Sequence, residues 1–397
     1  MNFGFTEEQE LLRAEVRKFL DQNCPLAEVR KLAETPEGFA RDFWKRMAEL
    51  GWVGLTLPEA CGGVGLGWED LVVVLEETGR TLFPSPLIAT VLAGHAIARS
   101  GSAAQQRRWL PRLADGSAIG TVALLEASDS PDPAAIALRG RREGDAFVLD
   151  GEKLFVLDAQ TADLFVVAFR TGDAPQALSL GVVPRNAPGL TVDPLPTMDE
   201  TKRMGRVRFA GVRVDADALL GQAGGAAAAI ARIVDEGAVA VTAESIGAAE
   251  AVHQLTVGYA RQRVQFDKPI GQFQGVKHPL AVAFVDIESW KSLCYYAAWT
   301  LDASPEDAPL AVSRAKAWAS DAFPRIGIEA IGLHGGIGYT WEYDAQLYLK
   351  RAKWMRPQFG DADFHFERVA RLGGGLESPP TRSEAEPSEG RQPERER

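Results

Sequence analysis

The spacing of apolar residues changes twice along this chain of 397 residues. From Leu12 to about Leu113, apolar side chains recur at the spacing of three to four residues that is typical of amphipathic helices. From about Gly120 the spacing falls to roughly two, as in strands, and after Gly225 the helical spacing returns over long segments. This order predicts a mostly helical α+β protein with three structural parts.

The three parts can be placed along the sequence. We expect an N-terminal helical domain over 1–119, a middle antiparallel β domain over 120–222 and a C-terminal four-helix bundle over 223–373. The bundle helices are expected at 226–263, 276–302, 308–334 and 344–372. At the start of the first helix, Thr6 and Gln9 have the spacing of a capping box. Residues 374–397 are charged, rich in proline and nearly free of apolar side chains, which predicts a disordered tail.

The strands of the middle domain are expected to be short apolar runs between Gly, Pro and Asp residues. These runs are 147–149, 153–156, 164–169, 177–183 and 206–209. Asp150-Gly151 separates the first two runs, and this dipeptide is typical of a type I′ turn, in which both central residues need positive φ. We therefore expect a hairpin at Asp150-Gly151.

Charge and cysteine content exclude several classes of function. Acidic residues outnumber basic ones by 54 to 43, so nucleic acid and anionic membranes are poor partners. The three cysteines are widely spaced and form no CxxC pair, which argues against a disulfide framework and against a zinc or other metal site. The N-terminus lacks the pattern of a signal peptide, and no run of about 18 apolar residues occurs, so we expect a cytoplasmic protein.

Two segments of the C-terminal half carry residues suited to binding an anion. The run His-Gly-Gly-Ile-Gly from His334 to Gly338 lies between two predicted helices, and a glycine pair lets the backbone approach a ligand with its N–H groups exposed. The second segment runs from Arg263 to Gln274, and a guanidinium can bind phosphate oxygens in a bidentate manner. Taken alone, the first would be a helix-cap loop and the second a solvated helix end.

Together with the order of the three parts and the glycine-rich segment over 57–67, these two segments resemble the acyl-CoA dehydrogenase flavoproteins over residues 1 to about 372. The resemblance implies FAD as the cofactor, an acyl-CoA as the substrate and an electron-transfer flavoprotein as the electron acceptor. In this family a carboxylate removes the α proton of the thioester, and FAD accepts the β hydride. The implied FAD-binding residues are Arg263, Phe266, Gln274, His334, Gly335, Gly336 and Gly338. In the family, the segment with the arginine binds the diphosphate and adenosine end of an FAD held by the neighbouring subunit.

Other positions depart from the family pattern as a group. Leu125 and Leu157 stand where the family has two threonines that contact the flavin ring, and Phe155 replaces a tryptophan that covers the ring. Ala238 replaces an arginine that lies close to the acyl-CoA, and Gly332 replaces a glutamine near the adenosine end. Each loss of a hydroxyl removes a hydrogen-bond partner from the ring.

The catalytic carboxylate is missing from both positions where family members carry it, because Gly360 and Gly237 stand there. Asp361 and Glu236 are the adjacent acids and are therefore the candidate catalytic residues of this chain. Adjacent helix positions point about 100° apart, which makes solvated or capping carboxylates the alternative for both. His365 is a further candidate base, with a plain helix-face histidine as its alternative.

Three hypotheses follow from this pattern. The favoured one is a base-lacking subunit that completes the FAD site in a hetero-oligomer with a second acyl-CoA dehydrogenase subunit. The FAD-binding segments persist, while the ring, base and substrate positions are replaced together. The second hypothesis is a self-sufficient dehydrogenase, a homodimer or homotetramer, with Asp361 or Glu236 as the base. The third is an acyl-CoA-binding scaffold without flavin.

Overall fold

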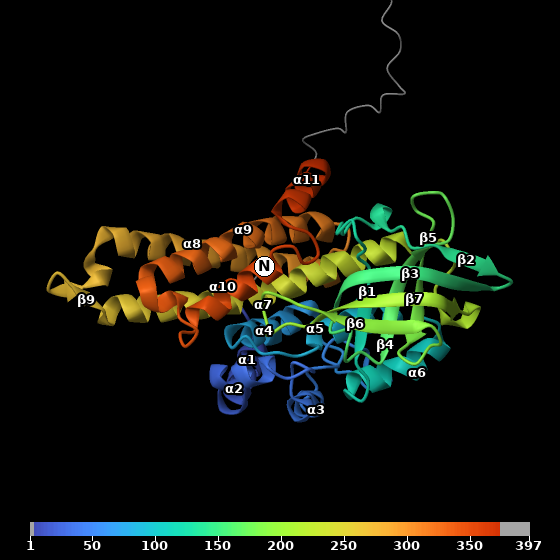
Figure 1. Cartoon of the computed structure of the whole chain (residues 1–397), viewed down its shortest axis with the longest axis horizontal. Coiled ribbons are helices and arrows are strands. Elements are labelled where there is room, and N and C mark those ends of the chain that lie inside the picture. The colour runs from blue at the N-terminus through green and yellow to red at the C-terminus, as the bar shows by residue number, and fades with distance from the viewer. Residues whose placement is uncertain (1–3, 374–397) are drawn as a thin grey trace, which may run out of the picture.

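The computed structural model describes residues 4–373. Figure 1 shows helices at the N-terminal end, strands in the middle of the chain and long helices at the C-terminal end, so the expected order is confirmed. The expected disordered tail at 374–397 lies outside the described residues. Within residues 4–373, no helix combines the length and the apolarity that crossing a membrane requires.

The N-terminal part is a cluster of six helices. They are α1 (Glu7–Asn23), α2 (Leu26–Ala33), α3 (Arg41–Glu49), α4 (Trp68–Arg80), α5 (Leu87–Ser100) and α6 (Ala103–Ala114), with a short 3-10 turn η1 (Glu59–Cys61). The capping box is confirmed, because the Gln9 N–H donates to Thr6 Oγ1 (3.2 Å) and the Thr6 N–H donates to Gln9 Oε1 (3.0 Å). Helix α4 packs very closely on the long helix α7 (Ala227–Gln262): a Cβ on Gly79 would lie 1.7 Å from the Glu244 carbonyl oxygen.

The middle part contains two four-stranded sheets. Its strands are β1 (Gly120–Ala123), β2 (Gly140–Glu143), β3 (Ala146–Leu157), β4 (Leu164–Arg170), β5 (Leu178–Pro184), β6 (Leu190–Leu195), β7 (Met204–Val214) and β8 (Leu219–Leu220), with 3-10 turns η2 (Pro133–Ala135) and η3 (Ala216–Ala218). The strand orders are β1-β4-β5-β8 and β2-β3-β7-β6. All pairs in these two sheets are antiparallel except β1 with β4, which is parallel.

The predicted hairpin at Asp150-Gly151 is wrong. Strand β3 runs without a break through both residues, which pair with Ala210 and Phe209 of β7. The register shifts between Leu149 and Asp150 because β7 carries one extra residue there, Gly211 with φ +69°, so the bulge lies in β7 and the dipeptide stays paired. The turn lies earlier, between β2 and β3, where Gly144 has φ +66°. Both sites carry glycine beside aspartate, so the local sequence signal did not separate them.

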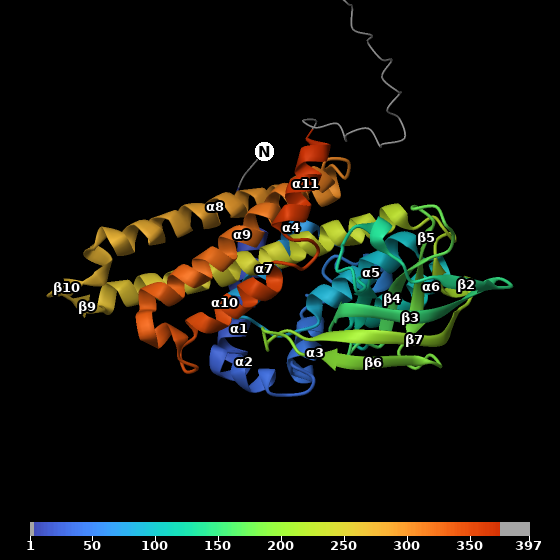
Figure 2. The same ribbon diagram turned by 45° about the horizontal axis from the view of Figure 1, so that its top comes forward.

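The C-terminal part is built on three long antiparallel helices. They are α7, α8 (Gln274–Ala303) and α9 (Ala308–His334), followed by α10 (Ala345–Met355) and α11 (Ala362–Leu372). Short elements between them are the ribbon of β9 (Val264–Gln265) and β10 (Lys268–Pro269) and the 3-10 turns η4 (Ile270–Gln272) and η5 (Gly335–Tyr339). Figure 2 shows α7 running from the β9–β10 ribbon to the β domain.

The first three predicted bundle helices agree with the structure to within two residues, but the single helix expected over 344–372 is wrong. A loop of residues 356–361 separates α10 from α11. Pro357 cannot continue the hydrogen-bonding pattern of a helix, and Gly360 has φ +102°. This loop brings Phe359 to the edge of the β domain, where the candidate site lies.

Candidate active site

A pocket lies where the β domain meets the start of α7 and the loop between α10 and α11. Its walls are mainly apolar and include Leu125, Phe155, Leu157, Val234 and Phe359. The polar side chains among its lining residues are Ser130, Asp132 and Gln358. An apolar chamber of this kind suits a flat ring or an acyl chain rather than a charged group.

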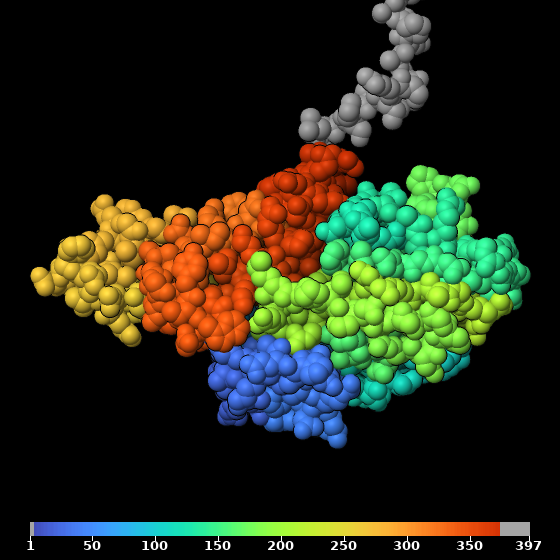
Figure 3. All heavy atoms as spheres, in the orientation of Figure 1, coloured from blue at the N-terminus to red at the C-terminus, as the bar shows by residue number. Residues whose placement is uncertain are grey.

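The pocket continues outward beside α11. A second pocket shares Ser130, Pro131 and Asp132 with the first and reaches Phe364 and Arg368 of α11. Figure 3 shows α11, in red, against the teal segment of the β domain. The candidate site therefore lies between the β domain and the helices, with α11 at its outer side.

The structure brings together the segments of the two glycines that the resemblance places at the base positions, Gly237 and Gly360. A Cβ added to Gly237 would lie 2.4 Å from the ring of Phe359, the residue that directly precedes Gly360 in the chain. A Cβ added to Gly360 would lie 2.4 Å from the Phe364 ring and 2.8 Å from His365 Nε2. Neither position has room for a longer side chain in this packing.

Glu236 is fully buried and points toward the N-terminal helices rather than into the pocket. Its carboxylate forms a bidentate pair with the Arg99 guanidinium, accepts from Arg232 Nε (3.1 Å) and lies 3.3 Å from His95 Nδ1. Burial favours the neutral acid, but the charges and hydrogen bonds of His95 and Arg99 hold the pKa of Glu236 well below its ordinary value. A carboxylate held ionised in this way is a weak proton acceptor, so its catalytic role stays a prediction that these contacts do not support.

Asp361 lies at the start of α11 and caps it. Its Oδ1 accepts from the Phe364 N–H (3.0 Å), and its other oxygen lies 3.8 Å from Arg356 Nη1. Burial, together with the negative charge of Asp361, raises the pKa of Asp129 in the facing loop of the β domain. Asp361 is therefore close to the mouth of the site, but its known contacts are those of a helix cap. Its catalytic role also stays a prediction.

One acid that sequence reasoning did not nominate as a base does line the pocket. Asp132 Oδ1 accepts from the Ala134 N–H (2.9 Å) and so caps the turn η2. The sequence did not show that Asp132 lines the pocket, because this depends on the fold, which brings its segment close to Val234 of α7. We therefore include Asp132 among the acids that a test of catalysis must cover.

His365 is buried inside the protein, away from solvent. Its Nε2 lies 3.0 Å from the Phe359 carbonyl oxygen and can donate a hydrogen bond to it. Burial and the charge of Lys316 lower the pKa of His365 to about 3, so the ring is neutral at ordinary pH. Its contact with the loop backbone fits a structural role.

The positions that differ from the family at the flavin ring all line the pocket. Leu125, Leu157 and Phe155 contribute to its walls, and Phe155 has φ +54°. Two residues hold this wall in place: Lys153 Nζ donates to Glu126 Oε1 (2.6 Å), and Glu126 accepts from the backbone N–H groups of Ala137 and Leu138, which follow η2. This wall is therefore held by buried polar contacts, and Leu125 and Leu157 contribute apolar side chains to it.

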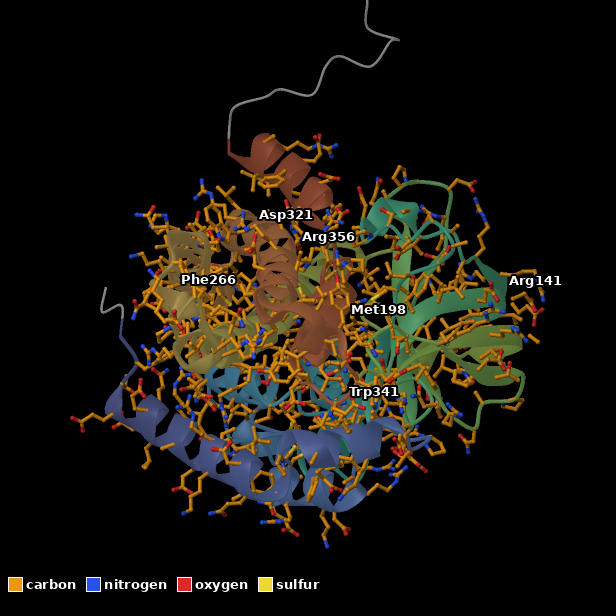
Figure 4. All side chains as sticks on the ribbon, turned by 60° about the vertical axis from the view of Figure 1, so that its left-hand side comes forward. Arg141, Met198, Phe266, Asp321, Trp341 and Arg356 are labelled. Carbon is orange, nitrogen blue, oxygen red and sulfur yellow. The ribbon has the colours of Figure 1, made fainter. Side chains whose placement is uncertain are left out.

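The expected diphosphate-binding residues lie on an exposed tip of the bundle. Arg263 and Gln274 are exposed, and Phe266 is 84% exposed with φ +52°. Within residues 4–373 the guanidinium of Arg263 has no hydrogen bond or ion pair. Figure 4 shows Phe266 on the bundle, on the opposite side of the molecule from Arg141 of the β domain. An exposed arginine beside an exposed aromatic ring fits the diphosphate and adenosine end of FAD.

The His334–Gly338 turn lies at the same end of the bundle. The buried His334 ring packs against the Tyr259 ring of α7 at a tilt of 36°, with 4.5 Å between ring centroids, and its Nδ1 is 2.7 Å from the Ala330 carbonyl oxygen. Gly335 and Gly336 are exposed and have open space where a Cβ would stand, so their backbone is accessible to a ligand. Gly338 is buried.

The two groups of candidate residues are far apart in one chain. Val234 lines the pocket near the start of α7, and Arg263 directly follows the end of this helix. At 1.5 Å per residue, the helix separates the two by roughly 40 Å. No cluster of three or more potential metal-ligating side chains occurs within residues 4–373.

Comparison with protein families gives three matches in chain order. Residues 6–117 match the N-terminal domain of acyl-CoA dehydrogenases, residues 122–212 the middle domain and residues 223–373 the C-terminal domain. Acyl-CoA dehydrogenase IpdE2 of Mycolicibacterium smegmatis is 33% identical over 348 residues, which cover 87% of this chain and 93% of that protein.

Solved structures share the same fold. The ChsE4–ChsE5 complex from Mycobacterium tuberculosis contains a chain with a TM-score of 0.87 and 28% identity, with 95% of this chain and 100% of that chain covered. A variant of the Tcur3481–Tcur3483 steroid ACAD has a TM-score of 0.84 and 31% identity, with 92% and 97% covered.

Proposed function

The chain belongs to the acyl-CoA dehydrogenase family of FAD enzymes, and within this family we propose that it is the FAD-completing, base-lacking subunit of a heteromeric dehydrogenase. The assembled enzyme would desaturate the Cα–Cβ bond of an acyl-CoA thioester. In that assembly, this chain supplies FAD-binding residues at the tip of its bundle, and a second acyl-CoA dehydrogenase subunit supplies the base.

The observation that carries the proposal is the packing around Phe359. The ring of Phe359 occupies the space beside Gly237, and Gly360 turns away from it with a positive φ. A base at either position would have to displace aromatic side chains. The acids next to these positions, Glu236 and Asp361, are engaged in an ion cluster and a helix cap. These contacts leave both acids poorly placed to remove the α proton, and Asp132, the acid that lines the pocket, caps the turn η2.

The distance between the pocket and the bundle tip supports the sharing of FAD between two chains. Arg263, Phe266 and Gln274 are exposed and face outward, roughly 40 Å along α7 from the pocket of the same chain. Their exposure and this distance support a role in the cofactor site of a neighbouring subunit. The guanidinium would bind phosphate oxygens, and the Phe266 ring would cover an apolar face of the dinucleotide.

FAD, when bound, supplies the hydride acceptor of the reaction. The residues of this chain would exclude water from the ring-side pocket and orient the diphosphate at the tip. The names of two similar structures, the ChsE4–ChsE5 complex and the Tcur3481–Tcur3483 steroid ACAD, each join two proteins, which supports a heteromer here. We expect an electron-transfer flavoprotein to collect the electrons.

Two other functions would give different results in the experiment described below. A self-sufficient homodimer or homotetramer would use Asp361, Glu236 or Asp132 as its base. An acyl-CoA-binding scaffold without flavin would bind the substrate alone, and the exposed Arg263 and Phe266 argue against it because they have no role there.

The test compares the chain purified alone with the chain co-purified with a second family member from the same genome. The chain alone should hold little FAD and should not reduce an electron acceptor with straight-chain or steroid acyl-CoA thioesters. The steroid thioester belongs in the panel because one similar structure is a steroid ACAD. The complex should hold FAD and turn over. A yellow homo-oligomer that turns over would refute the proposal.

A further inference from the structure

Lys316 of α9 is a fully buried lysine that the proposed chemistry does not use. An ammonium group in the protein interior is costly unless each of its three N–H donors has an acceptor. Lys316 Nζ lies 2.7 Å from Ser320 Oγ, 2.7 Å from the Gly360 carbonyl oxygen and 3.0 Å from the Arg356 carbonyl oxygen. All three donors are therefore used, two of them on the loop between α10 and α11.

The carbonyl groups that Lys316 contacts lie at the two ends of this loop. Arg356 follows the last residue of α10, and Gly360 is two residues before the start of α11. A third loop carbonyl, that of Phe359, lies 3.0 Å from His365 Nε2. Buried backbone carbonyls need donors, and here the side chains of α9 and α11 provide them from inside the protein.

We propose that Lys316 is a positioning residue that binds both ends of the loop over 356–361 and thereby holds the Phe359 ring against Gly237 in the wall of the pocket. The carbonyls that it fixes belong to the residues at the loop ends, and Phe359 lies between them. The assignment rests on contacts within one chain. It therefore stands or falls separately from the proposal of a base-lacking subunit.

The charge of Lys316 is set by its surroundings. Asp361 and Arg356 face it from the loop, Asp321 from its own helix and His365 from α11. Figure 4 shows Arg356 and Asp321 close together beneath α11, where they form an ion pair of 3.5 Å. Burial lowers the pKa of Lys316 to about 7, with Asp361 opposing this shift and Arg356 adding to it. A neutral amine keeps two N–H donors but loses the charge that strengthens its bonds to the two loop carbonyls, so the loop should loosen as pH rises through about 7.

Hydrogen exchange of the loop amides tests this role in the full chain, without added FAD. The Gln358 N–H donates to the Met355 carbonyl oxygen at the end of α10, and the Gly360 N–H donates to the Pro357 carbonyl oxygen, so exchange of these two amides reports opening of the loop. Lys316→Met keeps a side chain of similar length and removes the donors. We expect exchange over 356–361 to quicken by about tenfold or more, while peptides over β4 and β5 stay unchanged. Lys353→Met, at an exposed lysine of α10, is the matched control and should leave the loop unchanged.

The pH profile separates positioning from simple packing. After correction for intrinsic exchange rates, opening of the wild-type loop should increase between about pH 6 and 8, and Lys316→Met should show no such rise. Loop exchange in Lys316→Met equal to that of the wild type would overturn the proposal. If Lys316→Met also loses protection in β4 and β5, the wild-type profile decides alone, and a flat profile through pH 7 overturns the proposal.

Discussion

Single residues show where sequence reasoning about the site reached its limit. The resemblance predicted that Gly237 and Gly360 stand at the base positions of the family and that Glu236 and Asp361 are the adjacent acids. The 100° step between adjacent helix residues correctly indicated that Glu236 points elsewhere. Its partners could not be predicted, because His95 and Arg99 lie about 140 residues earlier in the chain and meet Glu236 only through the packing of α5 on α7.

Replacing the buried carboxylate of Glu236 should reduce stability and leave chemistry intact. Glu236→Gln leaves Arg99 and Arg232 without their countercharge, and breaking a buried ion cluster costs about 3 kcal/mol or more. Urea unfolding should show this loss. The control Glu250→Gln removes a partly exposed acid of the same helix and should cost about 1 kcal/mol or less. Equal losses in the two variants would contradict the structural role of Glu236.

The buried His365 makes stability depend on pH. Its pKa is about 3 in the folded chain, against about 6.5 in an unfolded chain, so below pH 6.5 the unfolded state binds a proton that the folded state does not. Stability should therefore fall as pH drops from 6.5 toward 3, by roughly 2 kcal/mol at pH 5. Denaturation at pH 7 and pH 5 measures this difference. His365→Gln should show a smaller difference, and an unchanged one would exclude His365 as its source.

At the scale of elements, the sequence predicted the type of most helices and strands but not how they end or meet. Helices α7, α8 and α9 were predicted well because their apolar periodicity is long. The break at Pro357 to Gly360 was missed, since the helical spacing on its two sides is in register. The contact of Gly237 with Phe359 was also missed, because it joins residues about 120 positions apart.

Two glycines of α7 should respond in opposite ways to alanine. Gly237→Ala forces a Cβ to within 2.4 Å of the Phe359 ring, so we expect a loss of about 1–3 kcal/mol from overpacking. Gly258→Ala meets no atom within 4 Å and should gain up to about 1 kcal/mol from helix propensity. Thermal unfolding of the two variants side by side is the measurement. A stabilised Gly237→Ala variant would show that Phe359 does not fill this space.

At the scale of the whole molecule, the order of the three parts followed from periodicity alone. The resemblance to the family rested on that order together with three short segments rich in glycine or carrying an arginine. The distance between the Arg263 and His334 segments and the pocket could not be predicted from the sequence, because it depends on the length and direction of α7. The proposal of a shared cofactor site rests on that separation.

The bundle tip should matter for FAD only in the assembled enzyme. Arg263→Ala should weaken FAD binding by roughly 10- to 150-fold, which corresponds to the loss of charge-assisted bonds of about 1.5–3 kcal/mol. Arg261→Ala, an exposed arginine two residues earlier, is the control and should retain FAD. Flavin content after dialysis at limiting FAD gives the answer. Full FAD occupancy in the Arg263→Ala variant would show that Arg263 does not bind FAD.

The most direct test of the base-lacking role is single-turnover bleaching of the flavin by acyl-CoA in the heteromer. Removing the catalytic carboxylate of the second subunit should slow bleaching by ~10²–10⁴-fold, the contribution of a general base. Asp361→Asn, Glu236→Gln and Asp132→Asn in this chain should each leave the bleaching rate nearly unchanged while FAD is retained. A loss of that size from one of these three substitutions, with FAD still bound, would show that this chain carries its own base.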